Sequence, residues 1–285
     1  MNILHISDLH FGSRHWKGND EKLLEKLNSY SADIVLNTGD STTDALESEF
    51  EAARNFLNSI ECEHVISIVG NHDKRNMRSQ DFFQEYINTV EPIRPKNPEK
   101  CTKNKLYIDG ITVGVKDKFT DINFIKKICI NGESLLVVCL DTNELYKDNG
   151  NVDEEVLQAV SDEITRQSYD QVILLNHHSI LETDSDPLFN SSLIIDLIKK
   201  HNIQHVFCGH THKLSVMKTI DLYHQFFFTQ YKNGTLTSHS HPRDTNMFMF
   251  YENLGKKDMK INLIRVCIKG DRLIFNEEVI AIENN

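Results

Sequence analysis

Several features that would place this chain outside the water-soluble globular proteins are missing from its sequence. No run of about 18 apolar residues occurs, so we expect no membrane-spanning helix and no membrane partner. The strand-like segment that starts at Asn2 follows Met1 directly, which leaves no room for a cleaved secretory signal. These absences predict a cytoplasmic protein.

Cysteine pairs at metal-binding spacing are also missing. The six cysteines are scattered and none forms a CxxC pair, which argues against a zinc site built from thiolates. In a reducing compartment we expect them to be free thiols, most of them buried.

A dense stripe of lysine and arginine is the third absence. The net charge is −11, whereas a protein that grips a long polyanion normally needs a basic face to neutralise phosphates. We therefore expect no long nucleic acid as a partner and favour a small phosphorylated substrate, whose charge bound cations could offset locally. Nothing in the sequence indicates an oligomeric state.

Apolar and amphipathic segments alternate along the first part of the chain. Its 285 residues, 39% of them hydrophobic, suffice for one large α/β domain. Short apolar runs predict buried parallel strands, and repeats at three and four residues predict helices, such as the one that carries Phe50, Ala53 and Leu57. The strands predicted here are Ile3–Ser7, Ile34–Asn37 and Val65–Val69.

The rest of the chain predicts two helices and many strands. The helices are expected from about Asp153 to Arg166 and over Leu188–His201, and Asp109-Gly110 is a hairpin signal. The strands are expected at Leu106–Ile108, Ile111–Val115, Leu135–Leu140, Val172–Leu175, His205–Cys208, Phe226–Thr229, Met247–Tyr251, Ile261–Ile268 and Leu273–Val279. We predict a single domain over residues 1–285, with two mixed sheets packed face to face and helices outside. Its strand-rich C-terminal part, 223–280, would complete the second sheet.

Five short polar motifs each follow a predicted strand. They are Asp8-Leu-His10, Gly39-Asp40, Gly70-Asn-His-Asp73, Asn176-His177-His178 and Gly209-His-Thr-His212. Ligands of open α/β sheets bind beyond the carboxyl ends of the strands, and all five motifs occupy such ends. Carboxylate, imidazole and amide oxygen suit divalent first-row metals, so the motifs together predict a metal site. In Asp-x-His and His-x-His we expect an extended segment to place both side chains on one side.

Each motif alone has a simpler interpretation. An isolated Asp-x-His pair at a strand end usually binds no metal, and Gly-Asp is most often a turn. The residues from Asn71 to Asp73 could form a capping turn before a helix near Ser79. Five such motifs in this order, all at strand ends, would be a rare coincidence, and this favours the metal site.

The order of the motifs resembles that of the calcineurin-like metallophosphoesterase superfamily. The pattern D-x-H, G-D, G-N-H-D, H, G-H-x-H is complete and spans Asp8 to His212, about three quarters of the chain. The resemblance implies a four-layer αββα sandwich, which agrees with the two packed sheets predicted above.

The resemblance also implies roles for the motif residues. The expected ligands of two divalent metals are Asp8, His10 and His212 for one, Asn71, His177 and His210 for the other, and Asp40 as the bridge between them. His72 would act on the phosphoryl oxygens or the leaving group, and Asp73 would orient His72 by a hydrogen bond.

The implied chemistry is metal-dependent hydrolysis of a phosphoester. A hydroxide that bridges the two metals would attack phosphorus in line with the leaving group, and His72 would serve as general acid. The metals would also offset charge on the phosphoryl oxygens. The mixed oxygen and nitrogen donors favour Mn or Fe, and Zn, Co or Ni could also bind.

One further segment narrows the substrate. Leu140-Asp-Thr, Gly150 and the helix from Asp153 look like the class III cyclic-nucleotide phosphodiesterase branch, which favours a phosphodiesterase for a small nucleotide such as a cyclic one. Ser41 and Ser179 depart from residues common in the superfamily, and both lie near the expected substrate. The residues named as substrate-binding candidates are Arg14, His178 and Arg243, of which His178 could instead be structural.

Other functions stay open. The alternatives are a nuclease of the recombination-repair type, a phosphomonoesterase, a lipid-linked pyrophosphatase, and a scaffold protein that has lost its metals. The chain is short of a DNA-binding cap domain, and the scaffold alternative conflicts with a complete set of seven ligands.

Overall fold

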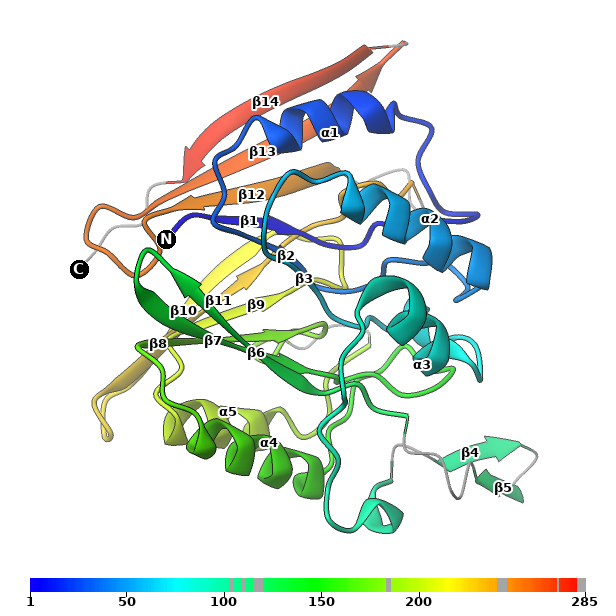
Figure 1. Cartoon of the computed structure of the whole chain (residues 1–285), viewed down its shortest axis with the longest axis vertical. Helices are drawn as coiled ribbons and strands as arrows, with labels where there is room; N and C mark the ends of the chain where they lie inside the picture. Colours follow the sequence, from blue (N-terminus) through cyan, green and yellow to red (C-terminus); the bar gives the residue numbers. More distant parts are fainter. Residues whose placement is uncertain are drawn as a thin grey trace.

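Two mixed six-stranded sheets form the centre of the molecule (Figure 1). The computed structural model describes residues 1–102, 105–108, 111–114, 120–182, 186–239, 245–270 and 272–280, with only the backbone for 105–108 and 111–114. Helices cover the outer face of each sheet, which gives four layers. The predicted αββα sandwich is confirmed.

The first sheet has the strand order β14-β13-β12-β1-β2-β3. Its bounds are β1 (Ile3–Ile6), β2 (Ile34–Asn37), β3 (Val65–Ser67), β12 (Asn246–Glu252), β13 (Lys260–Lys269) and β14 (Arg272–Ile280). Strands β1, β2 and β3 run parallel, as their continuous apolar runs predicted, whereas β12 pairs antiparallel with β1.

The second sheet has the strand order β10-β11-β9-β8-β7-β6. Its bounds are β6 (Phe124–Ile130), β7 (Glu133–Leu140), β8 (Gln171–Asn176), β9 (His205–Cys208), β10 (Ser215–Asp221) and β11 (Phe226–Lys232). Strands β7, β8, β9 and β11 are parallel, and the hairpins with β6 and β10 close the two edges.

The C-terminal part divides between the sheets, contrary to the prediction that 223–280 completes the second one. Only β11 joins the second sheet, while β12, β13 and β14 extend the first. The reason lies in burial: the middle five residues of β12 are all buried, and next to β1 in the first sheet one face packs between the sheets through Met249 while the other packs under the helices through Phe248.

The helices bury one apolar face each. Their bounds are α1 (Asp20–Asn28), α2 (Glu47–Asn58), α3 (Ser79–Phe82), α4 (Glu154–Arg166) and α5 (Ser191–Lys200). Helices α1 and α2 pack on the first sheet through residues such as Leu23 and Phe56, and α4 and α5 pack on the second through residues such as Val160 and Ile194. A third apolar cluster, which includes Phe207 and Tyr251, lies between the sheets.

Short elements complete the described chain. They are the 3-10 turns η1 (His72–Lys74) and η3 (Pro98–Lys100), the π-helical turn η2 (Phe83–Ile87), and the hairpin β4 (Lys105–Ile108) and β5 (Ile111–Gly114). The predicted turn residues Asp109 and Gly110 lie outside the described residues. Among the described helices, none is long and apolar enough to cross a membrane.

The cysteines only partly match the prediction. All six are free thiols, as predicted. Cys129 and Cys267 are exposed and Cys62 is partly buried, so the prediction that most of the cysteines are buried was wrong. Cys129 and Cys267 lie on strands with one face in solvent, which a count of apolar neighbours does not reveal.

Hydrogen bonds join the loops that follow the parallel strands of both sheets. The Asp8 and His10 amides donate to the carbonyls of Gly39 and Asp40, each at 3.0 Å. The Gly209 amide donates to the His177 carbonyl, also at 3.0 Å. The loops that carry the five motifs therefore meet at one end of the sandwich.

Candidate active site

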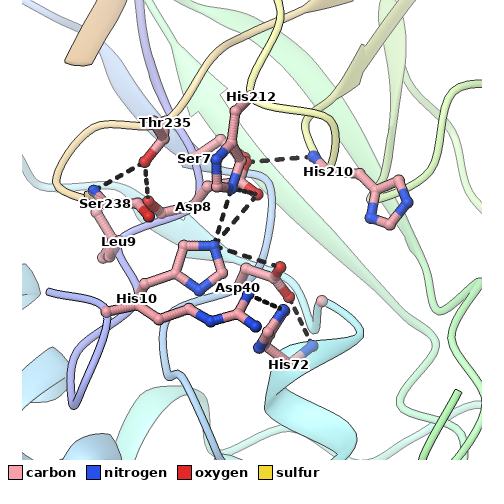
Figure 2. A network of polar contacts seen from close by, with 12 residues as sticks. Ser7, Asp8, Leu9, His10, Asp40, His72, His210, His212, Thr235 and Ser238 are labelled. Carbon is pink, nitrogen blue, oxygen red and sulfur yellow. Dashed lines mark hydrogen bonds and ion pairs between the residues drawn. The ribbon is translucent and has the colours of Figure 1, made fainter. Parts of the chain in front are cut away.

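One group of motif side chains comes from β1 and β9. His10 Nε2 lies 3.0 Å from His212 Nε2, and Asp8 Oδ1 lies 3.4 Å from His212 Nε2 and 3.9 Å from His10 Nε2. Figure 2 shows the three side chains pointing toward one another. Asp8 Oδ2 is occupied by hydrogen bonds from the Ser7 hydroxyl and the His210 amide, whereas the buried Oδ1 accepts none.

A second group forms around Asn71. Its Oδ1 lies 3.0 Å from both His177 Nε2 and His210 Nδ1. Asp40 Oδ2 reaches both groups, at 3.4 Å from His177 Nε2 and 3.7 Å from His10 Nε2. The structure thus brings all seven sequence-predicted ligands together in two adjacent sets that share Asp40.

These donor sets fit divalent cations. A buried carboxylate oxygen without a hydrogen bond is costly in a protein interior, and Asp8 Oδ1 is such an oxygen, with two imidazole nitrogens facing it. Oxygen and imidazole donors without sulfur suit Mn, Fe or Zn. The other ring nitrogen of His177, Nδ1, donates a hydrogen bond to the Thr38 carbonyl at 2.7 Å. Such a bond fixes the tautomer and orientation of an imidazole that binds a metal.

The backbone at the motifs is not extended, which corrects the prediction for Asp-x-His and His-x-His. Asp8 and His10 have φ of 55° and 48°, and His210 and His212 have φ of 77° and 55°. Asp40 has φ of 54°. Left-handed backbone at residues other than glycine is uncommon and strained, and five such residues here indicate a geometry held by the site.

The charges inside the site are strongly coupled. Burial alone would raise the pKa of Asp40, but His177 and His72 outweigh it and hold this pKa well below its usual range. Burial lowers the pKa of His177, yet the Asp40 carboxylate more than reverses this and raises it to about 9. Burial lowers the pKa of His10 to about 3. These shifts favour an ionised Asp40 carboxylate with positive charge beside it, which either an imidazolium at His177 or a metal cation can supply.

His72 sits at the entrance, outside the two donor sets. Its Nδ1 donates to the Thr43 carbonyl at 2.6 Å, which leaves Nε2 as the acceptor of a hydrogen bond from Arg14 Nη1 at 3.0 Å. The His72 amide also donates to Asp40 Oδ1 at 2.8 Å. His72 is thus held at the shared carboxylate with Nε2 turned to the cleft.

Asp73 does not orient His72, so that prediction is wrong. Its carboxylate accepts hydrogen bonds from the Thr42 amide and hydroxyl, each at 2.8 Å, and from the amides of Gly70 and Ser41 at 2.9 and 3.2 Å. Burial and the nearby Asp40 raise the pKa of Asp73 to about 7. Asp73 therefore ties the β2 and β3 loops together, and Thr43 holds His72 instead.

The three residues predicted to contact substrate have different outcomes. A cleft of about 400 Å³ opens over the donors, and Arg14 lines it. His178 lies below the cleft with both ring nitrogens bonded, to Thr142 Oγ1 at 2.8 Å and to the Asp148 carbonyl at 2.9 Å, so its prediction as a substrate contact is wrong. Arg243 lies outside the described residues.

Four charged residues of the cleft were not predicted from the sequence. They are Arg75, Asp148, Asp186 and Lys213. Arg75 and Lys213 directly follow the third and fifth motifs, within one or two residues, and this adjacency was a usable signal. Asp148 and Asp186 lie in polar stretches without any pattern, so only the fold brings them to the site.

An αββα sandwich with buried Asp and His clusters at its strand ends defines a metallophosphoesterase. The sequence profile of the calcineurin-like phosphoesterases matches residues 1–214, and the chain belongs to this family. No curated protein matches the chain significantly.

Solved structures with the same fold are distant in sequence. A purple acid phosphatase from yellow lupin aligns with a TM-score of 0.55 and 9% identity, over 99% of this chain and 53% of the phosphatase. GAP50, the anchor in the inner membrane complex of Plasmodium (0.54, 10%), is covered over 89% by the whole chain. The Haemophilus influenzae NAD nucleotidase (0.52, 14%) is covered over 49% by 99% of the chain. At these identities the likeness shows the fold alone.

Proposed function

We propose that the protein is a metal-dependent phosphodiesterase that acts on a small nucleotide-type substrate such as a cyclic nucleotide. The observation that carries the proposal is the convergence of seven donor side chains into two sets that share Asp40, directly below an open cleft. Two divalent cations in these sets would activate water and offset the charge of the phosphoryl oxygens. Asp8, His10 and His212 would hold one cation, Asn71, His177 and His210 the other, with Asp40 between them.

A small substrate agrees with the shape and charge of the cleft. Its volume of about 400 Å³ lies in the range of small-molecule sites. The net charge of −11 opposes a long polyanion, whereas Arg14 and Lys213 bring positive charge to the cleft itself, and Arg75 beside them is paired with Asp148. The segment Leu140-Asp-Thr with Gly150 adds the resemblance to cyclic-nucleotide phosphodiesterases.

The residues at the entrance have separate tasks in this proposal. The Arg14 guanidinium, fixed beside His72, would bind a phosphoryl oxygen through its remaining N–H groups. His72 would exchange a proton with the leaving group at Nε2, because Thr43 keeps Nδ1 protonated and the ring in place.

The test is hydrolysis of a substrate panel with added Mn²⁺. The panel holds 3′,5′- and 2′,3′-cyclic nucleotides, a bis-aryl phosphodiester, an aryl phosphomonoester and single-stranded DNA. We expect turnover of a cyclic nucleotide, and a loss of at least about a hundredfold in Asp40→Asn, because bound metals supply several kcal/mol of transition-state stabilisation. The control is Asp170→Asn, since Asp170 is exposed and binds Ser134 away from the site.

Other outcomes would point elsewhere. Turnover of the monoester alone would indicate a phosphomonoesterase, and degradation of DNA at physiological salt would indicate a nuclease. Inactivity toward every substrate with two metals bound would refute the nucleotide substrate, and equal activity of Asp40→Asn and the wild type would refute the metal site.

A further inference from the structure

The segment from Asp141 to Gly150, here called the strap, runs alongside the turn that carries Asn71 and His72. Asn143 Nδ2 donates to the Val69 carbonyl at 2.8 Å, before this turn. The Tyr146 amide donates to the Lys74 carbonyl at 3.0 Å, after it. The strap thus fixes both ends of the turn that supplies a proposed metal ligand.

Asp148 makes the contact between the strap and that ligand. Its Oδ1 accepts hydrogen bonds from Asn71 Nδ2 at 2.9 Å and from Arg75 Nη2 at 2.8 Å. An ionised carboxylate only accepts hydrogen bonds, so it must face the NH₂ end of the amide. The oxygen end of Asn71 is then turned toward His177 and His210, each 3.0 Å away.

The orientation of this amide matters for metal binding. An amide NH₂ has no lone pair available for a cation, whereas the amide oxygen is a good ligand. With either end of the amide free to face the histidines, part of the population would present the wrong atom. A fixed acceptor behind Asn71 removes that alternative.

The position of Asp148 is itself held by residues of the predicted substrate segment. The Asp148 carbonyl accepts a hydrogen bond from His178 Nε2 at 2.9 Å, and Thr142 Oγ1 bonds His178 Nδ1 at 2.8 Å. Gly150 lies against the same ring, because a Cβ added there would come within 2.7 Å of His178 Cγ. The His178 ring therefore holds the strap in place through Thr142, Asp148 and Gly150.

We propose that Asp148 is a positioning residue that orients the amide of Asn71 for metal binding, with the strap as its support. This inference rests on the proposed function, since it takes Asn71 as a metal ligand. It gives the Leu-Asp-Thr…Gly segment a task in building the metal site, separate from any contact with substrate.

The experiment measures Mn²⁺ binding by titration calorimetry in the full-length chain, together with thermal stability. Asp148→Ala should weaken one of two Mn²⁺ sites by about 10- to 100-fold, the effect usual for a residue that orients a ligand. Asp148→Asn, which keeps an acceptor oxygen and the same shape, should recover most of the affinity. Arg75→Gln breaks the ion pair but leaves the bond from Asn71 to Asp148, and should bind two Mn²⁺ within about threefold of the wild-type affinity.

The variant Asn71→Ala distinguishes failure of the Asp148 role from failure of the proposed function. Loss of one Mn²⁺ site in Asn71→Ala with unchanged binding in Asp148→Ala would overturn the role of Asp148 and leave the proposed function standing. Unchanged binding in Asn71→Ala would instead refute Asn71 as a ligand. Equal losses in Arg75→Gln and Asp148→Ala would also overturn the proposal, since the ion pair and not the amide would then be responsible. Asp148 has a half-exposed side chain, so the two Asp148 variants should fold.

Discussion

His10 and His212 bring their Nε2 atoms to within 3.0 Å of each other, although 202 positions separate them in the chain. One neutral imidazole can donate its Nε2–H to the other, or a cation can lie between the two nitrogens. Burial lowers the pKa of His10 to about 3, which disfavours an imidazolium, and the adjacent buried Asp8 Oδ1 accepts no hydrogen bond. The pair is therefore arranged for a cation.

Removal of metal should destabilise the protein. A ligand present at about 100 times its Kd stabilises the folded state by about 2.7 kcal/mol, so removal of each metal by a chelator should lower Tm by about 4–5 °C for a chain of this size. Differential scanning calorimetry with and without chelator measures the shift. His10→Ala should show a smaller shift, because it loses one donor set; an unchanged Tm in metal-depleted wild type would contradict the prediction.

His72 should matter for turnover and not for metal binding. Its Nε2 faces the cleft and Arg14, and its Nδ1 is held by Thr43. We expect His72→Gln to lower kcat by about 10²–10⁴-fold, the usual contribution of a general acid or base, with KM nearly unchanged. Metal analysis should still find two Mn²⁺ per chain, and loss of one of them would reassign His72 as a ligand.

The sequence predicted the site more completely than the fold around it. Buried parallel strands have a clear signal in continuous apolar runs, and their carboxyl ends must meet at one end of a sheet. Asp8, Asp40 and Asn71, which follow three strands of one sheet, could therefore be placed together from the sequence, and the family resemblance added His210. Strand pairing over long distances has no comparable signal. Nothing in β12 indicates that it pairs with β1, more than 240 residues earlier.

The sequence also did not reveal the local backbone conformation of the motifs or the hydrogen-bond partners of their side chains. The left-handed backbone of Asp8 and His10 follows from the convergence of five loops and not from their own side chains. The family resemblance assigned Asp73 to its sequence neighbour His72, but the turn aims the Asp73 carboxylate at Thr42 and Gly70. Sequence adjacency says which residues share a turn and not which atoms meet.

Lys74 should be essential for stability because it neutralises a buried acidic cluster. Its Nζ lies 2.6 Å from Asp141 Oδ2 and 3.7 Å from Asp121 Oδ1, and all three side chains are buried. Lys74→Met would remove this buried cation from beside both carboxylates and should cost about 3–5 kcal/mol of unfolding free energy. Urea denaturation measures this cost. Arg265→Met, at an exposed ion pair with Glu278, should cost less than about 1 kcal/mol, and a similar cost in both variants would count against the prediction.

His205 should weaken the protein in acid. Burial against Tyr231 lowers its pKa to about 4, below the ordinary value of 6.5, so the unfolded state gains its proton first as pH falls. The stability that the neutral imidazole contributes is present above pH 6.5 and is lost between pH 6.5 and 4, by at most about 3 kcal/mol. His205→Gln should flatten this part of the unfolding free energy measured against pH. A parallel decline in variant and wild type would assign the acid sensitivity to other groups.

Gly150→Ala offers an independent test of the strap, because it changes no charged or ligating residue. The added methyl would lie 2.7 Å from the His178 ring and 2.9 Å from Leu188 Cδ1, so the ring must move and Asp148 with it. We expect overpacking to cost about 1–3 kcal/mol of stability, and we expect the Mn²⁺ affinity to fall as it does in Asp148→Ala.

The control is Gly132→Ala, in the β6–β7 turn. There a φ of 85° makes alanine costly by about 1–2 kcal/mol, but no atom lies within 4 Å of the added methyl. Both variants lose stability, so a fall in Mn²⁺ affinity confined to Gly150→Ala would tie the metal site to the strap. Equal affinities in the two would mean that the site tolerates displacement of Asp148.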